Sequence, residues 1–176
     1  MRIKICILGI TCITLLPLGA KAFWEETKSH FQQILCRGQT ELYVPVNTWH
    51  NRWTYNHHRV HKYNERPWGI GIGKVLSEDS YKYSLAAMEF QDSHDKVEPI
   101  FAYKWQKVWR ADKTVRPTLG WMAGITMRQE YSYLPIPLAL PVAGLDIGPF
   151  SFETTYIPHL GKNKGDVLFS WIQWRF

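Results

Sequence analysis

The chain lacks a long apolar segment outside its first 22 residues. Although 45% of its residues are hydrophobic, no later run approaches the roughly 20 consecutive apolar residues that a membrane-spanning helix requires. A bundle of membrane helices is therefore excluded. Any membrane contact must be made by strands or by a helix lying on the membrane surface.

Residues 1–22 have the pattern of a secretory signal peptide. A basic start, an apolar core and a small-residue cleavage site follow one another as Arg2 and Lys4, Ile5 to Leu18, and Ala20-Lys21-Ala22. The alternative is an N-terminal anchor helix, for which the apolar core is short. We predict that residues 1–22 are removed on export.

Cysteine is scarce as well. Two of the three cysteines, Cys6 and Cys12, lie in the predicted signal peptide, which leaves Cys36 alone. A single thiol cannot form a disulfide within the chain, so the fold must be stabilised in another way. We interpret Cys36 as an apolar residue of a helix.

Strong charge and cofactor motifs are also missing. Loss of Arg2, Lys4 and Lys21 with the signal peptide lowers the formal net charge from +6 to +3, and the remaining basic residues are scattered, so we expect no nucleic-acid partner. The glycines of 69–73 lack the spacing and the following helix of a dinucleotide loop. The histidines of 57–61 have no acidic or cysteine partner nearby. We therefore expect no cofactor and no metal.

Aromatic residues and alternating segments are abundant instead, with nine Trp and nine Tyr. Residues 23–38 predict a short amphipathic helix on the periplasmic side, with Gly38 as its stop. Eight strand candidates fill residues 41–176: about 41–51, 68–77, 81–91, 97–110, 117–130, 139–147, 150–158 and 166–176. Short turns alternate with longer loops between them, which is typical of outer-membrane barrels. The predicted fold is all-β, an eight-stranded antiparallel transmembrane β-barrel preceded by this helix.

The alternation within strands predicts which side chains face inward. In 97–110 the aromatic residues Phe101, Tyr103 and Trp105 are expected outside, which places Lys104 in the lumen. In 81–91, Met88 belongs to the inward face, together with small residues and Phe90, as suits a lumen that is packed or binds an alkyl chain. The residues from Leu42 to His50 at even positions are expected to share one face.

A soluble lipocalin-like barrel is the main alternative, since it also has a signal peptide and eight strands. The last candidate strand favours a membrane barrel. Leu168, Ile172, Trp174 and Phe176 share a face, and the chain ends on the aromatic Phe176. An apolar outer face with girdles of Trp and Tyr is what a barrel wall in contact with lipid requires.

Three polar residues are expected to meet at one rim of the barrel. His50 ends the first strand, and Asp92 and Ser93 end the third, so all three leave the barrel at the end with the longer loops. A histidine can act as general base, with an acid or a nucleophile beside it. The pattern therefore predicts a site suited to acyl transfer.

Prolines gather around the strand 139–147. Pro135, Pro137 and Pro141 have no N–H to donate to a neighbouring strand, and Pro158 ends the next candidate strand. Ordinary loop prolines are one interpretation. The other is a gap in the barrel wall through which a lipid tail can pass sideways.

Several motifs resemble those of the PagP family of outer-membrane lipid A palmitoyltransferases. They are spread over nearly the whole chain after residue 22: Thr48-Trp49-His50, Tyr63-Asn64-Glu65-Arg66-Pro67-Trp68-Gly69, and segments 88–93, 98–99, 133–137 and 155–158. The resemblance implies an acyltransferase of the Gram-negative outer membrane. It would move a palmitoyl or similar chain from the sn-1 position of a glycerophospholipid to the hydroxyl of an N-linked hydroxyacyl chain of lipid A. We expect a monomer, with a homodimer as the alternative.

The resemblance also assigns roles to individual positions. His50, Asp92 and Ser93 match the family's catalytic positions, and we take His50 as the general base. The substrate-binding candidates are Pro135 and Pro158 at a lateral lipid entrance, Lys104 at the floor of the acyl-measuring cavity, Met88, Gly69 and Gly71 along that cavity, and Arg66 in the first long loop. Arg66 belongs to a basic group with Arg52, Arg59 and Lys62, which suits either lipid A phosphates or an anionic surface in general.

Lys104 departs from the family, in which this position is typically small. A buried ammonium group is costly unless it is paired, and Glu153 is the expected partner because its parity also points inward. We expect Lys104 to raise the floor and either shorten the accepted acyl chain or make the selection of chain length less strict. Two other functions stay open at this point: a lipid deacylase or phospholipase of the same membrane, and a non-catalytic surface barrel.

Overall fold

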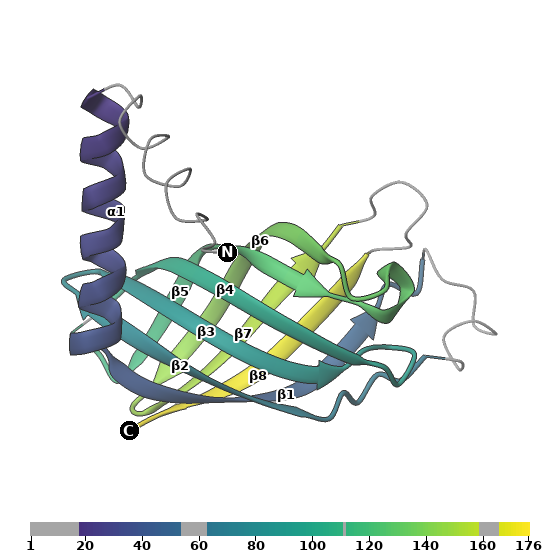
Figure 1. Ribbon diagram of the computed structural model, residues 1–176. Helices are drawn as coiled ribbons and strands as arrows, with labels where there is room; N and C mark the ends of the chain where they lie inside the picture. The colour runs from purple at the N-terminus through teal and green to yellow at the C-terminus, as the bar shows by residue number, and fades with distance from the viewer. Residues whose placement is uncertain (1–17, 54–62, 111, 159–165) are drawn as a thin grey trace, which may run out of the picture.

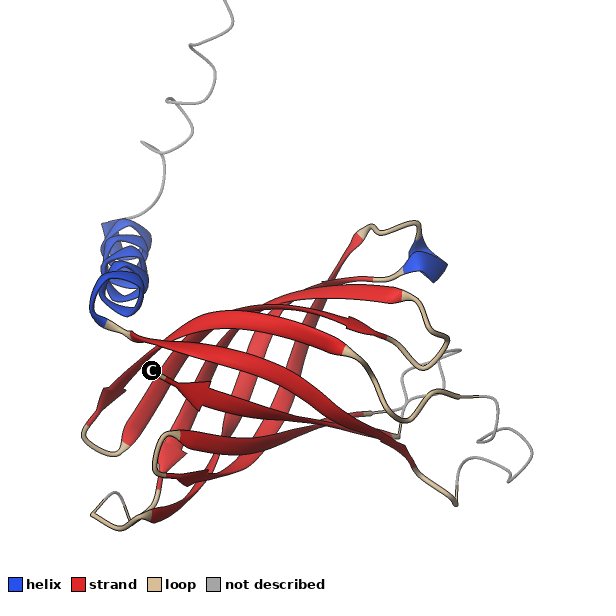
Figure 2. Ribbon diagram, turned by 90° about the horizontal axis from the view of Figure 1, so that it is seen from below, coloured by secondary structure: helices blue, strands red, loops and turns tan. Residues whose placement is uncertain are grey.

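Eight antiparallel strands pair in chain order and close into a barrel, with β1 against β8 (Figures 1 and 2). The computed structural model describes residues 18–53, 63–110, 112–158 and 166–176, with side chains from Trp24 onward. The strands are β1 Gln39–His50, β2 Gly69–Glu78, β3 Tyr81–Gln91, β4 Val97–Val108, β5 Val115–Met127, β6 Pro135–Ile147, β7 Phe150–Ile157 and β8 Val167–Arg175. The all-β prediction with eight strands is confirmed.

The two ends of the barrel differ. Short turns join β2 to β3, β4 to β5 and β6 to β7, and the C terminus lies at the same end (Figure 1). The connections at the opposite end, where β1 finishes at His50, are mostly longer, although the β3–β4 connection (92–96) is one residue shorter than the β4–β5 connection (109–114). One of the connections at this end contains a 3-10 turn over Gln129–Tyr131. Short and mostly longer connections alternate as predicted, except that the β4–β5 connection is longer than the β3–β4 connection. The arrangement brings the candidate site residues to one rim.

The helix α1, Leu18–Arg37, precedes the barrel and packs at the short-turn end (Figure 1). Its His30 ring meets the Tyr83 ring edge-on at 4.6 Å, and Ile34 is fully buried. The helix ends before Gly38, as predicted, but it begins five residues earlier than the predicted start at residue 23. Residues 1–17 of the predicted signal peptide lie outside the described residues.

The described helices do not include one long and apolar enough to cross a membrane.

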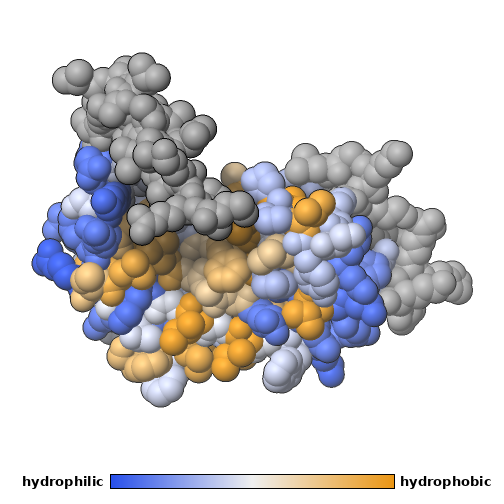
Figure 3. All heavy atoms as spheres, in the orientation of Figure 1, coloured by the Kyte–Doolittle hydropathy of each residue, from blue (hydrophilic) through white to orange (hydrophobic). Residues whose placement is uncertain are grey.

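The outer face of the barrel wall is apolar. Hydrophobic residues gather mainly over the middle of the barrel in Figure 3, with hydrophilic residues towards both ends. The exposed set includes Val44, Ile70, Ile72, Phe101, Leu119, Trp121, Ile125, Phe152, Ile172 and Trp174. Full removal of one such side chain from water is favourable by roughly 1.5–3 kcal/mol of free energy. A contiguous band of these side chains therefore indicates an apolar environment around the barrel.

Strand β1 contains a bulge near its middle. Pro45 pairs with Trp171 of β8, and Asn47 pairs with Ser170, the next residue along β8. Val46 is therefore an extra residue with no counterpart on β8. A proline cannot donate to the ladder, and such residues are found at bulges and ladder ends. The sequence pattern of β1 gave no sign of this extra residue.

The bulge overturns the prediction that the even-numbered residues from Leu42 to His50 share one face. Val44 and Val46 are exposed on the outside, whereas Thr48 and His50 are buried and only 8% and 3% exposed. Because side chains alternate with a period of two, one extra residue moves everything beyond it to the other face. His50 therefore points into the barrel.

The prolines of β6 lie within the strand, not beside it, so the predicted start at residue 139 is wrong by four residues. Pro135, Pro137 and Pro141 share one parity, and each pairs with a residue of β5. Alternate residues of an antiparallel strand direct their N–H groups to opposite neighbours. The carbonyl of Pro141 accepts from Thr155 of β7, so the backbone polar groups of this parity face β7. The missing donors therefore all belong to the β7 side, and the β5 side remains continuous.

Two ladders are incomplete towards the long-loop rim. β6 and β7 pair from Val142 opposite Thr155 down to Ile147 opposite Phe150, and residues 135–141 of β6 have no ladder partner on β7 in the described part of the chain. The carbonyl of Pro141 instead accepts from the Thr155 hydroxyl at 2.7 Å. β1 and β2 pair only as far as Tyr43 opposite Gly71. The barrel is thus closed near the short turns and has two breaks in backbone pairing above them.

Candidate active site

His50 lies between a hydroxyl and a carboxylate at the long-loop rim. Its Nε2 is 3.1 Å from Ser93 Oγ, and its Nδ1 is 3.2 Å from Glu65 Oε1. The same carboxylate oxygen accepts the backbone N–H of His50 at 3.2 Å. The Tyr63 ring stacks on the imidazole with centroids 4.8 Å apart. The predicted meeting of His50 and Ser93 is present.

The segment 63–66 joins the two strand ends that carry His50 and Ser93. The backbone N–H of Thr48 donates to the carbonyl of Glu65 at 3.0 Å, and the N–H of Asn64 donates to the carbonyl of Ser93 at 2.9 Å. This segment therefore bridges the rim at Thr48, above residues 44–47 of β1, which lie beyond the end of the β1–β2 ladder. The Tyr-Asn-Glu-Arg motif fixes the distance between the histidine and the serine.

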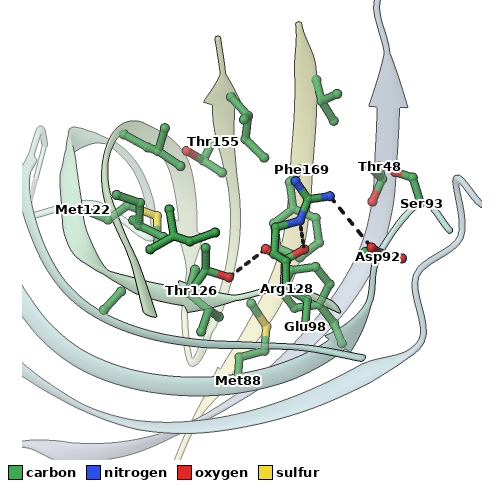
Figure 4. Close-up of a pocket in the computed structure, with 18 of the residues that line it drawn as sticks. Thr48, Met88, Asp92, Ser93, Glu98, Met122, Thr126, Arg128, Thr155 and Phe169 are labelled. Atoms are coloured by element: carbon green, nitrogen blue, oxygen red, sulfur yellow. Dashed lines mark hydrogen bonds and ion pairs between the residues drawn. The ribbon is translucent and has the colours of Figure 1, made fainter. Parts of the chain in front are cut away.

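Asp92 is adjacent to Ser93, and its carboxylate accepts hydrogen bonds from the turn in which both residues lie. Asp92 Oδ1 accepts the N–H groups of His94 and Lys96, both at 2.8 Å. Its Oδ2 is 3.8 Å from Arg128 Nη2, and Figure 4 shows Arg128 reaching between Asp92 and Glu98. Asp92 thus holds the turn that presents Ser93 to His50.

Glu65 is the residue that sequence reasoning missed. It sits in the quoted motif, but only the loop fold brings it opposite the end of β1, so no spacing rule pointed to it. Arg52 Nη2 lies 2.7 Å from Glu65 Oε2. Partial burial opposes ionisation of Glu65, yet the hydrogen bonds from Arg52 and His50 outweigh it and hold the pKa of this carboxyl below its usual range.

A cavity of about 730 Å³ extends inward from this rim. It is bounded at the top by His50 and Ser93 and at the bottom by Lys104 and Trp171. Its remaining lining is mainly apolar and includes Ala86, Met88, Phe90, Ile100, Ala102, Met122, Leu138, Leu140 and Phe169, some of which appear in Figure 4. Cavities of this size, about 300–1,000 Å³, are typical of sites that enclose small ligands.

The cavity is long and narrow. Its lining on β4 runs from Glu98 to Lys104, which corresponds to about 20 Å of strand at about 3.3 Å per residue. With a strand tilt of about 35–45°, the depth along the barrel axis is about 15 Å. Both edges of the β6–β7 break, including Pro137 and Pro158, line the cavity. An extended hydrocarbon chain fits this shape.

A layer of buried ionic groups closes the cavity below. Lys104 Nζ lies 2.6 Å from Glu153 Oε2, so the predicted pairing is confirmed. Lys82 Nζ lies 2.9 Å from the other oxygen of Glu153 and 3.0 Å from Asp146. The Lys104 ammonium also lies 4.9 Å from the centre of the Tyr43 ring. The lower lumen is therefore filled and charged.

The other predicted substrate-binding residues differ in their relation to the cavity. Met88 lies in the cavity wall. Gly69 and Gly71 act indirectly, because a Cβ at either position would come within 2.6 or 2.7 Å of the Cβ of Phe90 or Met88. They let β2 approach β3 closely while those two side chains fill the lumen.

Pro135 begins β6 at the edge of the ladder break, and Arg66 is exposed in the loop, where its N–H donates to Asn64 Oδ1. Residues 54–62, which include Arg59, Lys62 and the three-histidine group, lie outside the described residues. Cys36 is exposed on α1.

Asp92, His94 and Glu130 each bring one potential metal-ligand atom within 4.8 Å of the others. Positive charge is already supplied to this cluster, since Arg128 Nη2 lies 2.8 Å from Glu130 and Nε lies 3.3 Å from Glu98. We therefore assign these carboxylates to an ion-pair cluster around Arg128. Its members Asp92, Glu98 and Arg128 line the cavity and are drawn in Figure 4.

Comparison with known proteins connects this geometry to a family. Residues 30–173 match the family described as "Antimicrobial peptide resistance and lipid A acylation protein PagP". A protein of Erwinia tasmaniensis is 42% identical over an alignment of 177 positions, which covers 97% of this chain and 93% of that protein. Similar proteins of Laribacter hongkongensis (42% identical, 87% of this chain and 74% of that protein) and Dickeya dadantii (48% identical, 77% and 69%) have the same name, "Lipid A acyltransferase PagP".

Proposed function

Because this chain belongs to the PagP family and is an acyltransferase of lipid A, we propose that it transfers one palmitoyl or similar chain to lipid A from the sn-1 position of a glycerophospholipid. The acceptor is the hydroxyl of an N-linked hydroxyacyl chain. The observation that carries this proposal is the His50–Ser93 pair at the mouth of a long apolar cavity.

In this reaction His50 is the general base. The acyl chain lies in the cavity, which leaves the ester carbonyl near His50 and Ser93. His50 Nε2 takes the proton of the acceptor hydroxyl while the oxygen of that hydroxyl bonds to the carbonyl carbon of the donor ester. The bond to the sn-1 oxygen breaks, and the proton passes from His50 to that oxygen, which releases a lysophospholipid. Ser93 is placed to contact the reacting groups.

The two ladder breaks supply lateral access for two lipids. The β6–β7 break has Pro137 and Pro158 at its edges and meets the cavity directly, which suits the donor chain. The β1–β2 break lies beside His50 and the basic residues Arg52 and Arg66, which suits an acceptor with phosphate groups. Lateral entry of either lipid requires the apolar outer face to lie in a bilayer, so we propose that the protein resides in the outer membrane. We also propose that it works as a monomer.

Lys104 sets the length of the accepted chain. Its ammonium group and the Glu153 carboxylate beneath it form a floor that a hydrocarbon end does not penetrate, because displacing a buried ion pair is costly. A floor at the height of a lysine side chain leaves a shorter cavity than a small residue would.

A phospholipase is the second candidate, since a histidine between a serine and a carboxylate also suits hydrolysis. Purified protein in detergent micelles, given phospholipid with lipid A or with water alone, separates the two activities. Acyl-lipid A formed by the natural protein and lost in His50→Ala supports transfer. Free fatty acid formed at the same rate without lipid A supports hydrolysis.

A further inference from the structure

We propose that Glu65 is the positioning residue of this site, holding the imidazole of His50 so that Nε2 faces Ser93 and the reacting groups. This inference rests on the proposed role of His50 as general base. Asp92 was the acid expected from the sequence, yet the carboxylate at the far side of the imidazole belongs to Glu65. The role assigned to Glu65 is to orient His50, not to touch the lipids.

The protonation pattern follows from the contacts. An ionised carboxylate can only accept hydrogen bonds, so the contact of 3.2 Å between Glu65 Oε1 and His50 Nδ1 requires a proton on Nδ1. A neutral imidazole then has its lone pair on Nε2. That nitrogen lies 3.1 Å from Ser93 Oγ, so the hydroxyl donates and Nε2 accepts. Glu65 thereby selects the tautomer that can act as a base on the cavity side.

Arg52 keeps Glu65 in the ionised form that this arrangement needs. Its guanidinium lies 2.7 Å from Oε2, while Oε1 remains for His50, so each oxygen has its own charged or polar partner. Arg52 is half-exposed and Glu65 is partly buried, which keeps the pair at the surface of the site and outside the strands. The ion pair orients the carboxylate before any lipid is bound.

The same contact stabilises the intermediate charge of the reaction. When Nε2 takes a proton, both ring nitrogens are protonated and the imidazole becomes a cation next to the Glu65 carboxylate. Tyr63 stacks on one face of the ring and limits its rotation about the side-chain bonds. The carboxylate, the stacked ring and the Ser93 hydroxyl together fix the ring in one orientation.

A purely structural role for Glu65 must be separated from this one, because Glu65 also accepts the backbone N–H of His50. Glu65→Gln keeps the shape but removes the charge. Because Arg52 holds the amide oxygen on the Oε2 side, the NH₂ group takes the place of Oε1, the atom that contacts both the backbone N–H and Nδ1 of His50. There it donates to Nδ1, which favours the tautomer with the proton on Nε2. Glu65→Asp keeps a carboxylate and serves as the rescue variant.

Asp95→Asn is the matched control, since Asp95 Oδ1 accepts from Asn64 Nδ2 at 2.6 Å in the same pair of loops. It removes one charged loop contact without touching His50. Asp95 has a φ of 60°, a backbone conformation that asparagine adopts readily.

The experiment measures kcat, KM and the ring ¹⁵N shifts of His50 in the full-length barrel in detergent micelles, with His50→Ala to assign the signal. We expect Glu65→Gln to lower kcat by about 10²–10⁴-fold with little change in KM, and to move the proton from Nδ1 towards Nε2. Glu65→Asp should recover most of kcat, and Asp95→Asn should stay near the natural protein.

Two results would overturn the proposal. One is a Glu65→Gln variant with natural kcat while His50→Ala is inactive, which leaves the general base in place and removes Glu65 from the site. The other is an equal loss in Glu65→Gln and Asp95→Asn with the His50 tautomer unchanged, which reduces Glu65 to a loop contact. A fully active His50→Ala would instead contradict the proposed function itself.

Discussion

Lys104 places an ammonium group at the bottom of a cavity that is otherwise mainly apolar. Its partner Glu153 is also held by Lys82, so the ion pair stays in place when an acyl chain presses on it from above. The height of this floor and its charge are two separate properties. Substitutions of different length can distinguish them.

Lys104→Gly should lower the floor and shift the transferred chain towards greater length. Lys104→Met is the matched control, because methionine has a similar length without the charge and should keep the length preference of the natural protein. Glu153 retains Lys82 in both variants, so both should fold. The measurement is competition among donors of different chain length, with the products separated by mass. An unchanged preference in Lys104→Gly would contradict this role.

For single residues, the sequence was enough to predict the inward direction of those whose position follows from strand parity. The Lys104–Glu153 pair could be predicted because both lie in regular parts of strands and alternate side chains face inward. The Glu65–His50 contact could not be predicted, since it forms across a loop whose path depends on hydrogen bonds to Thr48 and Ser93. Loop geometry has no simple period.

The bulge of β1 is the element that orients the rim. Pro45 faces inward with Glu41 and Tyr43, and the extra residue Val46 precedes the inward-facing Thr48 and His50. Beyond the bulge the β8 register is regular again, so the bulge absorbs one residue without disturbing the pairs near His50. A deletion at the bulge and a deletion after it should therefore have opposite consequences.

Deleting Val46 should leave a regular strand in which Thr48 and His50 keep their β8 partners and their inward direction, and most activity should remain. Deleting Trp49 should turn His50 to the outer face and abolish activity. The assay is lipid A acylation by variants that are shown to assemble as heat-resistant barrels. An inactive but assembled Val46 deletion would show that the bulge itself, and not only the parity, positions His50.

Periodicity predicted the number, order and faces of most elements, and it failed at prolines. The predicted strand at 139–147 was too short because proline is normally taken as the end of a strand. In β6 the three prolines share one parity and leave the β5 ladder intact. The same residue type produced both the unpredicted bulge in β1 and the break between β6 and β7.

The whole barrel divides into two halves. The half near the long loops holds the cavity and has two incomplete ladders, whereas the half near the short turns has complete ladders and a packed ionic layer. Glu41 and Arg175, 3.1 Å apart, belong to the same lower half. We infer that the lower half provides the stability that lets the upper half remain open.

Removing one member of the ionic layer should therefore destabilise the whole barrel. Glu153→Leu leaves Lys104 buried without its carboxylate, and we expect a loss of about 3–5 kcal/mol in the free energy of unfolding. The double variant with Lys104→Met should recover most of this loss, since Lys82 keeps Asp146. Urea unfolding in detergent micelles measures both. Equal losses in the single and double variants would argue against the layer as a source of stability.

The proposed reaction of the whole barrel is transfer of an acyl chain from phospholipid to lipid A at the His50 rim. The most direct test is a mass spectrum of lipid A from a Gram-negative host that lacks its own enzyme of this kind and expresses either the natural chain or His50→Ala. We expect one added acyl chain with the natural protein and none with the variant, while both barrels assemble in the outer membrane. Lipid A that is unchanged or has lost a chain when the natural protein is present would contradict it.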